Sequence, residues 1–219
     1  MCGYTVGFVA GQSCATLAAS GPVWHGTLRT CSLSVLTAVA ATGVLWPAEE
    51  ATPVTDLEGR AVRPLEEATA KATVLVFVGT DCPISNRYAP EIGRLRERFA
   101  RQGVTFWLVY VQRTESAEAI RHHLREYFDT LAALRDPDHQ LVRRAAARVT
   151  PEAAVFVPGA AEARLVYHGR IDDRYVDFGR ARVAPTTHDL EDALAAVLAG
   201  RPVPRAVTPA VGCSIADSR

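Results

Sequence analysis

The chain has 219 residues, of which 48% are hydrophobic, and it carries 24 basic and 24 acidic side chains. This composition is sufficient for one ordinary hydrophobic core. The balanced charge offers neither a basic surplus for nucleic acid nor an acidic tail for a charged partner, so we expect no nucleic-acid partner.

The first 48 residues differ in composition from the rest. Up to Pro47 they contain no acidic residue, and Arg29 is their only Lys or Arg. Arg29 precedes the uncharged stretch Leu33–Trp46, a pattern typical of a secretory signal or an amino-terminal anchor. We therefore interpret residues 1–48 as a leader that contacts the membrane, with residues 1 to about 25 added by an upstream start codon. The alternative is a short apolar helix on the domain.

This leader predicts a periplasmic or otherwise extracytoplasmic protein. The chain has five cysteines, namely Cys2, Cys14, Cys31, Cys82 and Cys213. If the leader is removed, only Cys82 and Cys213 remain. An even number of cysteines in an exported protein favours pairing.

The next segment, 49–200, alternates between two kinds of hydrophobic pattern. Short apolar runs predict buried strands, and apolar residues at helical spacing predict helices. We expect strands at 73–78, 104–111, 134–137, 150–157 and 164–167. We expect helices at 85–101, from Ser116 through Phe128, at 140–149, and from Thr187 to Gly200. Ser116 and Thr187 are the expected helix caps.

These elements predict an α/β fold, with a central mixed sheet flanked by helices on both faces. The strand at 164–167 is the expected antiparallel hairpin partner of the strand that opens at Thr150-Pro151. Residues 201–219 contain Pro202, Pro204 and Pro209 without periodicity. They read as an extended tail that carries Cys213.

Cys82 lies between the apolar run 74–78 and the amphipathic stretch that follows it. This order places a thiol at the first turn of a helix, just past the carboxyl end of a buried strand. The helix dipole and the free backbone N–H groups stabilise a thiolate there. The position therefore predicts thiol chemistry by an accessible sulfur.

A cysteine after the first buried strand, with Thr150-Pro151 before a later strand, resembles the thioredoxin-like superfamily. Within it the chain is most similar to the redoxin group, which includes relatives of alkyl hydroperoxide reductase and thiol-specific antioxidant proteins. The resemblance covers residues 49–200, and the blocks Cys82–Glu91, Gly169–Tyr175 and Ala210–Cys213 look like a bacterial subgroup. Such relatives are sometimes joined to haem or copper-enzyme modules, which implies a haem- or copper-protein partner.

The resemblance implies that Pro151 is cis and lies beside Cys82. A cis bond would turn the chain and leave the backbone of Thr150 free to pair with an extended substrate. The alternative is a trans proline that opens a strand, where no ladder N–H is needed.

The chain departs from the family at the second cysteine, because it has Cys82-Pro83-Ile84-Ser85 in place of Cys-x-x-Cys. Ser85 is expected to donate a hydrogen bond to the Cys82 thiolate, while the neighbouring Asp81 disfavours that thiolate. A second sulfur must resolve any mixed disulfide. The twelve residues that follow Gly200 can span up to ~40 Å, so Cys213 can reach Cys82.

Cys213 is therefore the candidate resolving cysteine or structural disulfide partner; the alternatives are an unrelated tail thiol and a contact with another subunit.

Peroxiredoxins carry Pro-x-x-x-Thr-x-x-Cys, and Leu75 and Gly79 hold the Pro and Thr places here. A thiol peroxidase is thus the weaker alternative.

A different class of function is a non-enzymatic copper-binding or partner-binding module. Thiolate and imidazole ligands suit copper, so Cys82 and Cys213 with His188 or His168 would form such a site. Solvated surface histidines are the expectation we favour. Likewise, Asp172, Asp173 and Arg174 line the groove or, as we favour, form a solvated turn.

We expect a thiol–disulfide oxidoreductase that needs no cofactor or metal. Its partners would be protein or small-molecule thiols and disulfides. Cys82 is the expected nucleophile and Ser85 its stabiliser. Thr150 and Pro151 would form the wall of the substrate groove, and Cys213 would be the resolving thiol.

Overall fold

The computed structural model of the chain describes residues 53–67, 69–128 and 131–216. The predicted leader, 1–48, lies outside the described residues. The described residues group as one compact unit. In the part of the chain that is described, no helix combines the length and the apolar character needed to cross a membrane.

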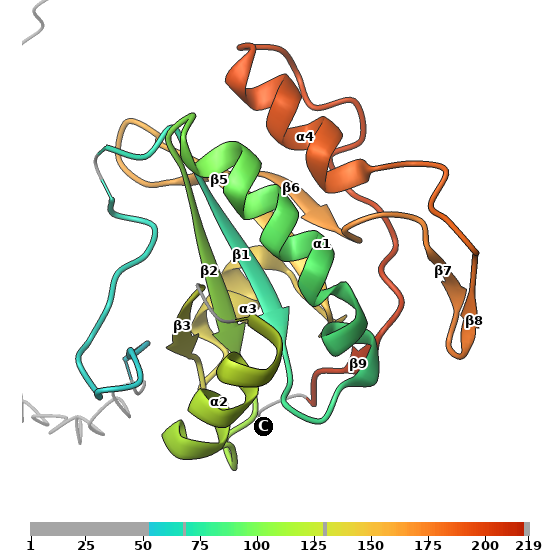
Figure 1. Cartoon of the computed structure of the whole chain (residues 1–219). Helices are drawn as coiled ribbons and strands as arrows, with labels where there is room; N and C mark the ends of the chain where they lie inside the picture. Colours follow the sequence, from blue (N-terminus) through green and yellow to red (C-terminus); the bar gives the residue numbers. More distant parts are fainter. Residues whose placement is uncertain (1–52, 68, 129–130, 217–219) are drawn as a thin grey trace, which may run out of the picture. The chain divides into compact units, whose positions relative to one another are not determined.

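A five-stranded sheet with the order β3-β2-β1-β5-β6 forms the centre of this unit (Figure 1). Its strands are β1 (Ala72–Val78), β2 (Val104–Tyr110), β3 (Ala132–Arg135), β5 (Glu152–Val157) and β6 (Arg164–Gly169). The first three are parallel, β5 runs antiparallel to β1, and β6 runs antiparallel to β5. The predicted mixed sheet and its terminal hairpin are thus confirmed.

Helices cover both faces of the sheet. They are α1 (Pro83–Ala100), α2 (Ala117–His123) with the π-helical turn η1 (Leu124–Phe128), α3 (Gln140–Ala145) and α4 (Asp189–Leu198). Successive side chains of β1 alternate between two buried clusters, because side chains of a strand point to opposite faces. One cluster contains residues of α1 and α4. The other contains residues of α3 and of the segment 53–67 before β1, called the lead-in segment below.

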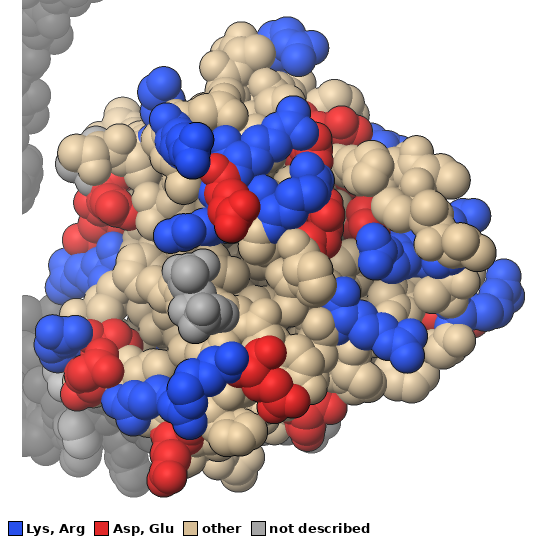
Figure 2. Space-filling model, in the orientation of Figure 1, with Lys and Arg blue, Asp and Glu red and all other residues tan. Residues whose placement is uncertain are grey.

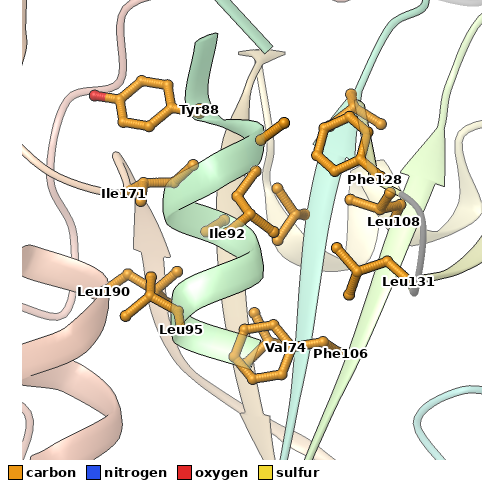
Figure 3. Close-up of a cluster of buried hydrophobic side chains, with 14 of the residues drawn as sticks. Val74, Tyr88, Ile92, Leu95, Phe106, Leu108, Phe128, Leu131, Ile171 and Leu190 are labelled. Atoms are coloured by element: carbon orange, nitrogen blue, oxygen red, sulfur yellow. The ribbon is translucent and has the colours of Figure 1, made fainter. Parts of the chain in front are cut away.

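The larger cluster holds α1 between the sheet and α4. Figure 3 shows Ile92 of α1 toward the sheet and Leu95 near Leu190 of α4. All three side chains are at most 1% exposed. This packing fixes the direction of α1, and with it the position of the cysteine at its start.

Two helix boundaries differ from the prediction for local reasons. Helix α1 begins at Pro83, because Cys82 is its N-cap and proline suits the first helical position. Helix α3 ends at Ala145 instead of continuing to Val149, because Ala146 adopts a left-handed conformation with φ 55°.

The predicted helix caps had different outcomes. Ser116 caps α2 as expected, with its hydroxyl accepting a hydrogen bond from the Ala119 N–H at 3.1 Å. Thr187 does not cap α4, because His188 is the N-cap and the Thr187 hydroxyl donates to Asp189. Tyr127, near the end of this predicted helix, is 38% exposed, although its neighbour Phe128 is buried. Tyr127 lies inside the π-helical turn η1, where the spacing of the side chains differs from that of an α-helix.

Two short pairs of strands have no counterpart in the sequence prediction. One is the hairpin of β7 (Tyr175–Asp177) and β8 (Arg180–Ala181). The other joins β4 (Val149–Thr150) to β9 (Cys213–Ser214), so the tail returns to the segment before Pro151. This second pairing brings the tail cysteine to the candidate site.

Replacing Ile92 by Ala tests the packing of α1. Because Ile92 is 1% exposed, we expect the free energy of unfolding to fall by about 2–5 kcal/mol in chemical denaturation. Glu97→Ala on the exposed side of the same helix is the matched control and should change it by less than ~0.5 kcal/mol. Equal effects of the two changes would contradict the described packing.

Candidate active site

Cys82 lies at the junction between β1 and α1. Its backbone N–H donates to the Gly79 carbonyl at 3.2 Å, and its carbonyl accepts from the Asn86 N–H at 3.2 Å. It is the N-cap of α1, with Pro83 directly after it. The helix dipole therefore favours a negative charge at this position, as the sequence predicts.

The Thr150–Pro151 peptide bond is cis, which confirms the expectation drawn from the resemblance. The Cys82 thiol donates a hydrogen bond to the Thr150 carbonyl oxygen, with 3.0 Å between Sγ and O. Pro151 is thus the residue directly after the carbonyl that Cys82 contacts. The structure brings together four of the predicted site residues, namely Cys82, Ser85, Thr150 and Pro151.

The tail cysteine joins this group. Strand β9 pairs antiparallel with β4, so that Cys213 lies opposite Thr150. Cys213 packs against the buried cluster that contains Cys82, and the side chains of the two cysteines interact. Both are free thiols in this structure.

Two details of the expected site are wrong in this conformation. Cys82 is only 1% exposed, although an accessible sulfur was expected. The backbone of Thr150 is not free for a substrate either, because it already pairs with the tail. The prediction brought Cys213 of the tail within reach of Cys82, but it did not include the pairing of the tail with Thr150.

Opposing effects act on the pKa of the Cys82 thiol. Burial raises this pKa, but interactions with the Cys213 side chain, with the Ser85 hydroxyl and backbone N–H, and with the Thr150 side chain outweigh it. The net result is a pKa below the ordinary value of a cysteine. The Ser85 hydroxyl oxygen is buried, and no nitrogen or oxygen partner is found for it among the described residues. It is therefore available to a thiolate.

Cys213 has the opposite character. Burial, the hydrogen bond to Cys82 and the charges of Cys82 and Asp81 together raise its pKa to about 12. Asp81, expected to oppose the Cys82 thiolate, accepts a hydrogen bond from Gln112 Nε2 at 2.8 Å. The two cysteines therefore differ: Cys82 forms a thiolate readily, whereas Cys213 keeps its proton.

Glu115 holds the turn that precedes Cys82. Its side chain is buried, and Oε1 accepts a hydrogen bond from the Thr80 N–H at 2.7 Å. Burial raises the pKa of this carboxyl group. The sequence analysis missed Glu115, because a single acidic residue after a strand carries no distinguishing pattern.

A buried histidine links α1 to β2. His123 Nδ1 lies 2.8 Å from the Tyr110 hydroxyl, and Nε2 lies 2.8 Å from Asn86 Oδ1. Burial lowers the pKa of His123. His139 is buried too, with Nε2 2.9 Å from the Val111 carbonyl oxygen. The expectation of solvated histidines is therefore wrong for these two residues.

Asp172 and Asp173 do not form the solvated turn that was expected, because they are 1% and 5% exposed. The Tyr88 hydroxyl donates to Asp172 Oδ1 at 2.5 Å, and Arg174 lies over the Tyr88 ring. Asp173 accepts hydrogen bonds from the backbone N–H groups of Thr186 and Thr187. The two aspartates therefore hold the segment after β6 against α1 and against the loop that precedes α4.

The predicted copper ligands are not assembled in the described part of the chain. His168 Nδ1 lies 3.3 Å from Glu152 Oε1. His188 falls in a group with Glu91 and Glu191, which is the only metal-ligand group of three or more found among the described residues. Arg94 pairs with both carboxylates of that group. Neither histidine joins the two sulfurs.

Charged side chains of both signs are interspersed on the face shown in Figure 2. This face therefore lacks the single-sign field that would steer a strongly charged substrate.

One open hollow on the domain lies away from this site. It is lined by the lead-in segment, by α3 and by the turn between β5 and β6. None of its lining residues is a member of the Cys82 site, so it carries no part of the thiol chemistry.

Comparison with known proteins agrees with this geometry. A family model described as the AhpC/TSA family matches residues 47–162. No curated protein matches the chain.

Two solved structures share much of the fold. An uncharacterized conserved protein from Geobacillus kaustophilus matches with a TM-score of 0.63 and 26% identity, over 76% of this chain and 88% of that one. A hypothetical protein from Sinorhizobium meliloti matches with a TM-score of 0.62 and 24% identity, over 74% of this chain and 88% of that one. The fold is therefore one that these two bacterial proteins share.

The opposite pKa shifts predict how the two thiols react with iodoacetamide as pH rises. The thiolate is the reactive form, so Cys82 should reach half of its maximal labelling rate below the pH expected of an ordinary cysteine. Labelling of Cys213 should reach half of its maximal rate only at a much higher pH, because the pKa of this thiol is raised to about 12. Peptide-resolved mass spectrometry of the reduced protein measures both. Coincident midpoints would contradict the asymmetry.

Proposed function

The chain belongs to the AhpC/TSA family and has a thioredoxin-like fold, and from this premise we propose that it is a thiol–disulfide oxidoreductase. Cys82 is the nucleophile and Cys213 is the resolving thiol. One observation carries the proposal: the only two cysteines among the described residues both contact Thr150, directly before a cis proline.

The exchange proceeds in two steps. The Cys82 thiolate attacks one sulfur of a substrate disulfide, so that a Cys82–substrate disulfide forms and the first substrate thiolate leaves and takes a proton from solvent. Cys213 then loses its proton and attacks the Cys82 sulfur, which forms the Cys82–Cys213 disulfide and releases the second substrate thiol. Two electrons pass to the substrate, and an external thiol reductant restores both cysteines.

The surroundings of Cys82 support its role as the attacking sulfur. A thiolate is the reactive form, and both the helix N-terminus and Ser85 favour it. The high pKa of Cys213 keeps that residue as a thiol until the mixed disulfide exists. Thr150 and Pro151 form the wall against which the reacting sulfurs align.

Peroxide reduction has less support. The places of the peroxidase proline and threonine hold Leu75 and Gly79. Leu75 lies in the middle of β1, paired with Trp107 on one side and Ala154 on the other. A proline at that place would remove a hydrogen-bond donor from a central strand. The backbone at Leu75 therefore does not suit the proline that the peroxidase motif has at this position.

Two further expectations stay predictions. One is export, which rests on Arg29 and the apolar run Leu33–Trp46. The other is a haem- or copper-protein partner, which rests only on the resemblance.

Reduction of insulin disulfides by a thiol reductant tests the proposal. The wild-type chain should accelerate the reaction, and Cys82→Ser should return it to the uncatalysed rate, because no attacking sulfur remains. Cys213→Ser should instead accumulate a mixed disulfide on Cys82, which non-reducing mass spectrometry detects.

Cys31→Ser, the same exchange within the predicted leader, is the matched control and should leave the rate unchanged. Full activity of Cys82→Ser would refute the assignment. Faster consumption of hydrogen peroxide than of insulin disulfides would favour the peroxidase.

A further inference from the structure

The tail is attached to the domain at two places. At the first, residues 206–208 line the edge of β6: the His168 N–H donates to the Ala206 carbonyl at 2.9 Å, and the Thr208 N–H donates to the His168 carbonyl at 3.2 Å. At the second, β9 pairs with β4, and the Ile215 N–H donates to the Arg148 carbonyl at 2.9 Å. Cys82 lies under the second attachment.

The two attachments differ in the burial of their side chains. Thr208 is 5% exposed, and its hydroxyl lies 2.8 Å from the Tyr167 hydroxyl. By contrast, β9 contains only two residues, of which Ser214 is exposed and Cys213 is half-buried. A two-stranded pair of this length is marginal by itself, so β9 is the part that can detach while Thr208 stays anchored.

Gly212 brings β9 unusually close to the site. A Cβ atom at this position would lie 2.1 Å from the Thr150 carbonyl oxygen, 2.7 Å from its carbon and 3.2 Å from the Pro151 nitrogen. All three are backbone atoms, which cannot rotate away. Any segment that follows the path of β9 therefore needs glycine immediately before its cysteine.

An edge of backbone N–H and C=O groups beside a reactive sulfur is suited to an extended chain segment. We infer that the β4 edge at Val149–Thr150 is a binding site for an extended segment whose cysteine directly follows a glycine. Strand β9 fills this site until such a segment displaces it. This inference rests on the proposed function, since the displacing segment is the disulfide-bearing substrate.

Displacement explains how a sulfur that is 1% exposed can react with a macromolecule. With β9 detached, the substrate cysteine takes the place of Cys213, and its disulfide bond to a second substrate sulfur faces Cys82. After Cys82 attacks, the first substrate thiolate leaves, and the substrate segment withdraws from the β4 edge while one of its sulfurs stays bonded to Cys82. Strand β9 then returns, and Cys213 attacks the Cys82 sulfur and releases the second substrate thiol. The closed state is thus the one in which the resolving step occurs.

Full-length Gly212→Ala tests whether β9 covers Cys82. The added methyl group should push β9 away from Thr150 and raise the labelling rate of reduced Cys82 by iodoacetamide by on the order of tenfold or more. Gly93→Ala adds the same methyl group where nothing lies within 4 Å and should label like the wild type. An unchanged labelling rate in a folded Gly212→Ala protein would overturn the inference.

A peptide added in trans tests the sequence requirement. The peptide Pro-Ala-Val-Gly-Ser-Ser-Ile-Ala, which is residues 209–216 with Cys213→Ser, should protect Cys82 of the Gly212→Ala protein from labelling. The same peptide with alanine in place of its glycine should not. Equal protection by both peptides, or by neither, would overturn the inference.

Labelling and protection require no disulfide exchange, so their failure is distinguishable from failure of the proposed function. Protected Cys82 with no insulin reduction would sink only the proposed function. Insulin reduction without the labelling change would sink only the inference. If circular dichroism shows that Gly212→Ala is unfolded, Ile215→Asp replaces it, because Ile215 holds the end of β9 by apolar contacts.

Discussion

The candidate site depends on the peptide unit of Thr150, which contacts both cysteines of the proposed redox pair. Its carbonyl oxygen accepts a hydrogen bond from the Cys82 thiol, and its backbone pairs with the strand that carries Cys213. The central sheet fixes one side of this arrangement, because β5 continues directly from Pro151 into the core. The other side is the two-residue strand β9, which we infer to be displaced by substrate.

In the proposed mechanism, this arrangement divides the chemistry between two sulfurs. Cys82 lies at the start of a packed helix, where backbone and hydroxyl groups favour its thiolate. Cys213 lies over it, half-buried and near the charge of Asp81, so its pKa is raised. A chain that lacks the second cysteine of Cys-x-x-Cys thus recovers a dithiol from a residue 131 positions later in the sequence. Because this second cysteine lies in the tail, access to Cys82 depends on where the tail lies.

Much of the scaffold follows from local sequence patterns. The continuous apolar run before Cys82 and the amphipathic stretch after it predict β1, α1 and the placement of the thiol. The cis bond at Pro151 follows from the family resemblance. These features are predictable because each is determined by neighbouring residues or by a motif.

The rest depends on contacts that leave no periodic signal. Strand β9 has only two residues, and the need for glycine at position 212 arises from the backbone of Thr150, far away in the sequence. Asp172 and His123 are polar and were expected in solvent, yet Tyr88 and Tyr110 provide them with buried partners. The covering of Cys82 was missed for the same reason, since it is a tertiary contact of an irregular tail.

Equilibration of the protein in a glutathione redox buffer, followed by non-reducing peptide mapping, tests the central claim most directly. If Cys82 and Cys213 are one redox pair, oxidation should link their two peptides within a single chain, with little glutathione on either cysteine. A glutathione adduct on Cys82 with Cys213 left free, or a link between two chains, would contradict the account.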